Sequence, residues 1–163
     1  MKSAIYAGSF DPFTNGHLSI VKKALTIFDH LHIMIANNPN KVGFLDTFYR
    51  EMAIRETLKA NQIVNAEPVV CQYLVAQLAG QLNVCHLVRG LRPCGDFENE
   101  YNMARINQDI AQDYGRKLET VFILADPYTA HVSSSLVREL YGHGGDIRNY
   151  VSQETLRVIN SVH

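Results

Sequence analysis

Short apolar runs rich in β-branched residues alternate with longer segments of helical period along the whole chain. The first apolar run covers residues 3–7, the second covers 31–36, and the segment between them has apolar residues at positions 18, 21, 25 and 28. That spacing lines one face of a helix, so the first 36 residues predict a strand, a helix and a second strand. Two consecutive strands separated by a helix are parallel in most folds, which restricts the chain to the α/β class.

The same alternation predicts five strands and six helices. Beyond the first unit, strands are expected at 67–70, 85–89 and 120–124, and helices at 47–60, 74–82, 96–114, 133–141 and 152–162. This order favours one doubly wound, five-stranded parallel sheet of Rossmann-like type. With no linker or repeat in the sequence, we expect a single domain over residues 1–163. In such sheets ligands bind beyond the carboxyl ends of the strands.

Composition excludes several kinds of partner. Fifteen basic and sixteen acidic residues give a formal charge of −1, which argues against a broad nucleic-acid or membrane face but allows a local cationic pocket. The three cysteines are odd in number and lack CxxC spacing, so we expect reduced thiols. The amino-terminal residues show no signal-peptide core, and no apolar run reaches membrane-spanning length, so we expect a cytoplasmic protein.

The turn after the first strand runs from Gly8 to His17 and is the first candidate for an anion site. It has glycines that permit close approach of a ligand, the hydroxyl of Ser9, and His17 at the start of a helix. Unpaired N–H groups and the helix dipole make such a helix start suitable for phosphate, and His17 can donate to charge that develops in a transition state. The alternative is a tight turn in which His17 serves only as a cap or core residue.

Cationic residues follow two other predicted strands. Arg89 and Arg92 flank Gly90 and Leu91 where the fourth strand ends, and guanidinium groups bind phosphate oxygens bidentately. The alternative for this pair is two solvated surface arginines. Lys41 follows the second strand and can hold a second anionic group.

Polar residues at two helix starts complete the candidates. Asp96 and Glu100 lie one helical turn apart, where they can bind a ribose or pair with Arg92. Carboxylates at a helix start also serve the dipole without any binding role. The segment 133–135 is three serines that can cap a helix and meet phosphate, or act as a plain cap.

Several familiar site motifs are missing from the sequence. It has no GxxxxGK[ST] loop, no GxGxxG fingerprint, no GxSxG elbow and no HExxH motif. The other histidines, His30 and His32 among them, show no ligand spacing along the sequence, so we expect no metal bound by protein side chains.

In combination these motifs resemble a known family. The segment 8–17, with Thr14 at the first histidine of an HxGH-type motif, and the segment Ser-Ser-Ser-Leu-Val-Arg at 133–138 resemble the nucleotidyltransferase superfamily. The threonine form, with Arg-Gly-Leu-Arg at 89–92 and Asp-Phe-Glu-Asn-Glu at 96–100, resembles the bacterial phosphopantetheine adenylyltransferase family over nearly the whole chain.

The resemblance implies a reaction and its partners. ATP and 4′-phosphopantetheine would give dephospho-coenzyme A and pyrophosphate in coenzyme A synthesis, with Mg²⁺ bound by the ATP phosphates, in a homohexamer built from two trimers. It implies catalytic roles for His17, Lys41 and Arg92. Acceptor-binding roles fall on Ser9, Lys41, Leu74, Val75 and Arg89. ATP-binding roles fall on Ser9, Phe10, His17, Gly90, Leu91, Arg92, Glu100, Thr129, Ala130, His131, Val132, Ser133, Ser134 and Ser135.

Two alternatives remain from the sequence. The chain can be another transferase of the superfamily, acting on nicotinamide mononucleotide or transferring a cytidylyl group. It can also be a non-catalytic module that binds a nucleotide or coenzyme A. The chain departs from the family pattern at Ser9, where threonine is usual, at Tyr73 beside the pantetheine segment, and at 129–132, where an aromatic residue followed by Ser-Phe-Ile is typical.

Overall fold

The computed structural model describes residues 1–37, 42–92 and 97–163. Its five strands are β1 (Ser3–Gly8), β2 (His30–Ala36), β3 (Ala66–Cys71), β4 (His86–Leu91) and β5 (Glu119–Leu124). Its six helices are α1 (Asn15–Ala24), α2 (Thr47–Ala60), α3 (Val75–Leu82), α4 (Phe97–Asp113), α5 (Ser134–Gly142) and α6 (Gln153–Val162). The α/β class and the order of elements are therefore confirmed.

All four strand pairs in the sheet are parallel, in the order β3-β2-β1-β4-β5. The chain moves outward from β1 to β3, then returns to the other side of β1 to add β4 and β5. The point where this direction reverses lies between β1 and β4. The loops after these two strands leave the sheet toward opposite faces, which opens a crevice between them.

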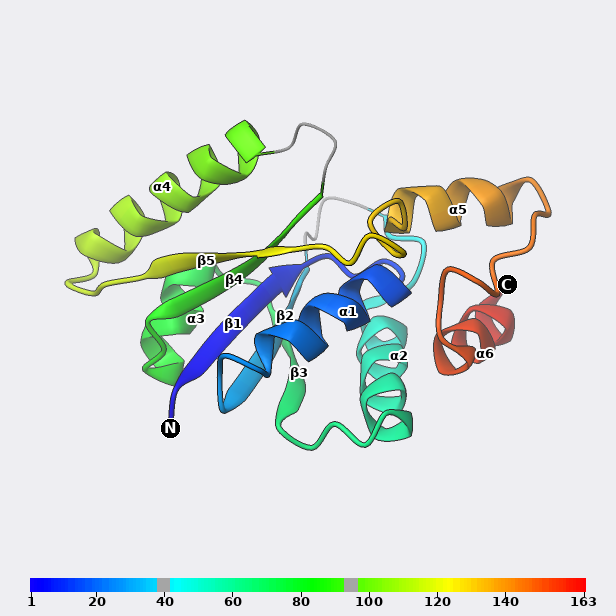
Figure 1. The fold of residues 1–163 in the computed structure, drawn as a ribbon, viewed down its shortest axis with the longest axis horizontal. Coiled ribbons are helices and arrows are strands. Elements are labelled where there is room, and N and C mark those ends of the chain that lie inside the picture. The colour runs from blue at the N-terminus through cyan, green and yellow to red at the C-terminus, as the bar shows by residue number, and fades with distance from the viewer. Residues whose placement is uncertain (38–41, 93–96) are drawn as a thin grey trace.

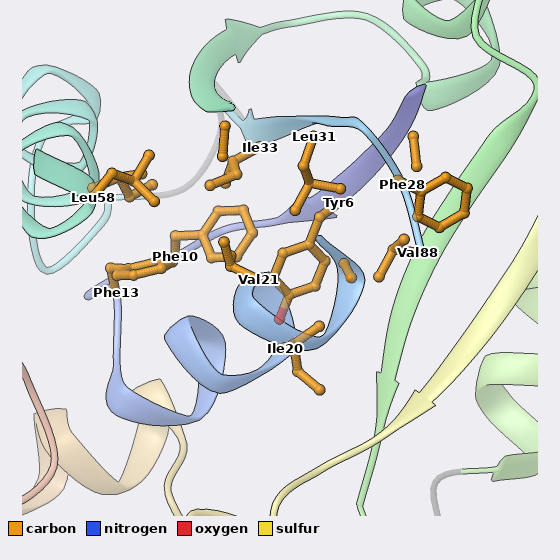
Figure 2. Packing of buried hydrophobic residues seen from close by; sticks show 14 of the residues in the cluster. Tyr6, Phe10, Phe13, Ile20, Val21, Phe28, Leu31, Ile33, Leu58 and Val88 are labelled. Atoms are coloured by element: carbon orange, nitrogen blue, oxygen red, sulfur yellow. The ribbon is translucent and has the colours of Figure 1, made fainter. Parts of the chain in front are cut away.

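Helices cover both faces of the sheet, as Figure 1 shows. On one face, side chains of β1 and β2 pack with Ile20, Val21 and Ala24 of α1 and with Ile54 and Leu58 of α2. Figure 2 shows this cluster, in which Tyr6, Phe10 and Phe13 lie against α1. On the other face, Ile5 and Leu87 pack against apolar residues of α3 and α4. Alternate residues of each strand thus enter different cores, as expected for a sheet buried on both faces.

A third apolar cluster joins the C-terminal helices to the rest of the domain. Leu45 and Ala53 pack with Val137 of α5 and with Val158 and Ile159 of α6. This contact holds α5 beside the carboxyl ends of the strands, where its first turn faces the loop after β1 (Figure 1). In the part of the chain that the structure describes, no helix combines the length and apolar character needed to cross a bilayer.

The expected boundaries differ from the structure by one or two residues at most element ends. The third strand begins at Ala66 and ends at Cys71, one residue longer at each end than expected. The third helix begins at Val75 because Leu74 has extended backbone angles and is the N-cap. The expected start of the fourth helix, Asp96, lies outside the described residues. In the described chain this helix runs from Phe97 to Asp113.

Candidate active site

A cavity of about 200 Å³ lies at the carboxyl edge of the sheet, between β1 and β4, where the strand order changes direction. Its walls come from β1, the start of α1, the end of β4, the first turn of α4 and the segment after β5. The lining residues are Tyr6, Gly16, His17, Ile20, Arg89, Gly90, Arg92, Glu100, Ala125 and Thr129. Residues far apart in sequence meet here because all five parallel strands end at the same edge.

His17 is held by the first turn of α1. Thr14 is the N-cap residue, and its hydroxyl oxygen accepts from the backbone N–H of His17 at 3.3 Å. In return, the backbone N–H of Thr14 donates to Nδ1 of His17 at 3.1 Å. This is a capping box in which histidine occupies the place usually held by glutamate or glutamine. Because Nδ1 accepts, the neutral imidazole carries its proton on Nε2.

The surroundings of His17 keep its ring uncharged. The imidazole lies among aromatic rings, with centroids 5.0 Å from Phe10 and 5.5 Å from Phe13. Burial, with a smaller contribution from the positive charge of Arg92, lowers the pKa of His17 from its ordinary 6.5 to about 3. The side chain is therefore a neutral hydrogen-bond donor at the cavity wall. The cap interpretation of His17 is confirmed, whereas its role as a donor in a transition state stays a prediction.

Arg89 is paired with Glu100 across the cavity. Its Nε and Nη2 donate to the two carboxylate oxygens at 2.6 and 2.7 Å, and Nη1 donates to the carbonyl oxygen of Ala7 at 2.9 Å. Burial opposes the charged guanidinium, but the hydrogen bonds and negative charge of Glu100 outweigh it and raise the pKa of Arg89. Of the alternatives left open for Glu100, the pairing with Arg92 is not the one observed, because Glu100 makes its bidentate contact with Arg89.

The start of α5 is fastened to the loop after β1. The Ser133 hydroxyl caps the helix by accepting from the N–H of Leu136, and the Ser134 hydroxyl donates to the carbonyl oxygen of Pro12 at 2.8 Å. Arg138 donates to the carbonyl oxygen of Asp11 at 2.6 Å. A Cβ at Gly16 would lie 3.0 Å from the carbonyl oxygen of Val132, a tight contact that would push the two segments apart by a few tenths of an ångström.

A second cavity of about 530 Å³ lies on the other side of the β1 loop. It is lined by Ser9, Asp11, Ala36, Val42, Gly43, Phe44, Arg50 and Arg138. Ala36 ends β2 and Val42 follows the undescribed residues 38–41. Lys41, the expected second cation, directly precedes Val42 in the sequence.

A buried carboxylate organises this second cavity. Asp11 and Arg50 are 8% and 7% exposed, and their charged groups lie 3.6 Å apart. Asp11 accepts from the backbone N–H groups of Phe44 and Leu45, both at 2.7 Å. Arg50 donates to the carbonyl oxygen of Leu45 at 2.7 Å and to that of Ser9 at 3.3 Å. The β1 loop, the segment before α2 and α2 itself are thereby joined.

The expected site residues fall into five groups. His17, Arg89, Gly90, Arg92, Glu100 and Thr129 line the first cavity, and Ser9 lines the second. Phe10 and Val132 are buried, with 1% and 2% exposure, so only their main chains could face a ligand. The others line neither cavity: Leu74, Val75, Leu91, Ala130, His131, Ser133, Ser134 and Ser135. Lys41 lies outside the described residues.

Four residues that shape the site were missed by the sequence interpretation: Tyr6, Asp11, Arg50 and Arg138. Asp11 and Arg138 stand inside the two motifs already recognised, so their position was a usable signal. Tyr6 looked like an ordinary strand residue, yet it lines the cavity, and burial raises the pKa of its hydroxyl. Nothing in the sequence pairs Arg50 with Asp11.

Comparison with known proteins shows the broad class of protein to which the chain belongs. The family model described as Cytidylyltransferase-like matches residues 5–140, which include the cavity and the start of α5. A solved structure from Vibrio parahaemolyticus, described as a candidate nicotinate-nucleotide adenylyltransferase, superposes with a TM-score of 0.68 over 98% of this chain and 99% of that one. At 15% identity it shows the fold alone. The family model places the chain in the nucleotidyltransferase class.

Curated relatives define the family within that class. Phosphopantetheine adenylyltransferase of Campylobacter hominis is 35% identical over 154 residues, covering 94% of this chain and 93% of the relative. The Streptococcus mutans enzyme of the same name is 38% identical over 156 residues, 95% of this chain and 90% of the relative. The Cytophaga hutchinsonii enzyme is 37% identical over 150 residues. The chain belongs to the phosphopantetheine adenylyltransferase family.

Removal of the buried carboxylate tests its structural role. Asp11→Ala leaves the buried Arg50 guanidinium without its opposite charge and two backbone N–H groups without their acceptor, so we expect a loss of about 3–5 kcal/mol in the free energy of unfolding. Urea denaturation measures it. As a control, Glu51→Ala removes the exposed pair with Arg55 and should cost about 0.5 kcal/mol or less. Equal losses in the two variants would contradict the assigned role of Asp11.

The lowered pKa of His17 predicts a pH dependence of stability. The folded chain has this pKa at about 3 and the unfolded chain near 6.5, so between these values the unfolded state binds the extra proton. The contribution of His17 to the free energy of unfolding is therefore fully present above pH 6.5, and it is lost as the pH is lowered toward 3. His17→Gln preserves a capping-box acceptor without titrating in this range. We expect a smaller loss of unfolding free energy between pH 6.5 and 4.5 in this variant than in the wild type. Identical losses, measured by urea denaturation, would refute the assignment.

Proposed function

We propose that the chain transfers the adenylyl group of ATP to the phosphate of 4′-phosphopantetheine, giving dephospho-coenzyme A and pyrophosphate. Membership of the phosphopantetheine adenylyltransferase family supports ATP and 4′-phosphopantetheine as the substrates. The observation that carries the chemistry is the neutral imidazole of His17, oriented by Thr14 beside Arg92 at the point of direction reversal. A phosphate ligand suits this position because a helix start and cationic side chains converge on it.

The reaction needs no protein nucleophile. An oxygen of the acceptor phosphate, already anionic near neutral pH, forms a bond to the α-phosphorus of ATP. The bond from that phosphorus to the bridging oxygen breaks, and pyrophosphate leaves with the electron pair. The protein's task is to align two polyanions and to stabilise the charge that accumulates in the transition state.

His17 and the two arginines suit that task. The Nε2–H of His17 can donate to the phosphoryl oxygens without first losing a proton, because its low pKa keeps the ring neutral. Arg92 supplies positive charge in the same cavity. Arg89 is held by Glu100, but both of its terminal nitrogens carry a second N–H, so the guanidinium can donate to a phosphate while it stays fixed.

The acceptor is proposed to enter from the side of the second cavity. Ser9 lines it, and Lys41 directly precedes Val42, which also lines it. Together they would bind the phosphate of 4′-phosphopantetheine. Leu74 and Val75, at the start of α3, lie after the next strand of the same edge and would contact the apolar part of the pantetheine arm.

Mg²⁺ is proposed to arrive on the nucleotide. Among the described residues that line the first cavity, Glu100 is the carboxylate, and Arg89 engages both of its oxygens. The lining therefore suits a metal bound by the phosphate oxygens of ATP and by water rather than by carboxylates of the protein. When bound, the ion would neutralise phosphate charge.

Turnover with defined substrates tests the proposal. Purified protein with Mg²⁺, ATP and 4′-phosphopantetheine should release pyrophosphate and form dephospho-coenzyme A. Competing acceptors, including nicotinamide mononucleotide, and CTP in place of ATP should react far more slowly. ATP binding without pyrophosphate release would instead indicate a binding module.

We expect His17→Ala and His17→Gln to lower kcat by ~10²–10⁴-fold, because each removes the imidazole donor. His17→Gln should also keep the thermal stability conferred by the capping box, so near-normal turnover in it would exclude His17 from the transition state.

We further propose that the chain forms a homohexamer in the cytoplasm. The family resemblance suggests the assembly, and the exposed side chains of Phe97, Tyr101, Met103 and Ile106 on α4 offer an apolar surface for contact between copies. The free thiols of Cys71 and Cys85 suit a reducing compartment. Sedimentation velocity should show a species of six chains, and Met103→Glu with Ile106→Glu should shift it toward smaller species. A monomeric wild type would refute the assembly.

A further inference from the structure

The amino-terminal end of the sheet carries a group of potential metal ligands far from the proposed active site. His30 and His32 lie two residues apart on β2, so both point to the face that packs against α3 and α4. Glu67 on the neighbouring strand β3 is the register partner of His32. The ligand atoms of these three side chains all lie within 4.8 Å of one another.

The distances between these atoms suit a tetrahedral metal. Glu67 Oε1 lies 3.4 Å from His30 Nε2 and 3.2 Å from His32 Nδ1. Bonds of 2.0–2.1 Å from a tetrahedral Zn²⁺ place neighbouring ligand atoms about 3.4 Å apart. The same distances are long for charge-assisted hydrogen bonds, which are about 2.7–2.9 Å. His30 Nε2 and Glu67 Oε1 lie within weak hydrogen-bonding distance, and all three atoms are close enough together to be ligands of one ion.

The burial of the cluster supports the same interpretation. His32 Nδ1 is buried and has no hydrogen-bond partner among the residues that the structure describes. Ile5, its register partner on β1, is fully buried, so one side of the cluster is apolar. The Glu67 side chain is 52% exposed, which leaves a path for an ion from solvent. A buried acceptor nitrogen without a partner is costly, and a metal ion would satisfy it.

We infer that His30, His32 and Glu67 form a binding site for a divalent transition metal of the Zn²⁺ type, with a fourth position open to water. Two imidazoles and one carboxylate are a ligand set that zinc accepts in proteins. A bound ion would cross-link β2 to β3, the edge strand of the sheet. The site lies about 13 Å along β2 from its carboxyl end, at a rise of about 3.3 Å per residue. It is thus distinct from the nucleotide cavity, and the earlier expectation of no protein-bound metal is replaced by this proposal.

Metal titration of the isolated protein tests the inference without reference to turnover. After treatment with EDTA, calorimetric titration with Zn²⁺ should show one site per chain, and Co²⁺ should give the visible absorption of a tetrahedral complex. Excess Zn²⁺ should raise the thermal unfolding temperature, because a ligand that binds the folded state stabilises it.

Three ligand variants and one matched control assign the site. His30→Asn, His32→Asn and Glu67→Gln should each weaken Zn²⁺ binding by ~10-fold or more and abolish the Co²⁺ spectrum. His143→Asn removes an exposed histidine outside the cluster and should change neither. Glu67→Gln is the decisive variant, because its exposed side chain can change without disturbing the fold. Absence of a one-to-one complex, or equal Zn²⁺ affinity in wild type and Glu67→Gln, would overturn the inference.

Discussion

The architecture of the active site depends on the buried carboxylate of Asp11. Through its side chain, Asp11 holds the backbone of Phe44 and Leu45 and faces Arg50 of α2. Through its carbonyl oxygen, it binds Arg138 of α5. A single residue in the loop after β1 therefore joins this loop to α2 and to α5. A buried charge is tolerated only where its hydrogen bonds are satisfied, so this loop has little freedom to adopt another conformation.

The same loop leads into the start of α1, which holds the side chain of His17. The imidazole completes the capping box with Thr14, so the same contact that begins the helix also fixes the tautomer and direction of the ring. A substitution at His17 is consequently expected to affect the stability of the helix together with the proposed chemistry. The glutamine variant is informative because glutamine is an ordinary partner in a capping box but lacks the imidazole.

The two ends of the parallel sheet offer different chemistry. At the carboxyl end, helix starts and arginines from separate strands gather around a cavity, which suits polyanionic ligands. At the amino end of β2, the strand period and the register with β3 bring two imidazoles and a carboxylate together. The proposed anion site thus arises from loops and helix starts, whereas the proposed metal site arises from strand side chains alone.

Much of the fold follows from local pattern. Strand and helix periods from Ser3 to Val162 predicted every element within one or two residues at most ends, because periodicity and capping residues are local properties. Parallel pairing followed from the alternation of strands and helices. The loops that would carry the site could also be predicted, since parallel strands end at one edge, and His17, Arg89 and Arg92 do meet there.

Contacts between distant segments could not be predicted from the sequence. Neither the choice of Arg89 rather than Arg92 as partner of Glu100 nor the pairing of Asp11 with Arg50 follows from spacing along the chain. The position of Glu67 beside His32 depends on strand register, which is set by packing of the whole sheet. The sequence alone determined the elements, their order and the motifs shared with the family, because those are encoded within short segments. Only the tertiary structure decided which charges pair and which ligand atoms converge, because those distances depend on how separate segments pack.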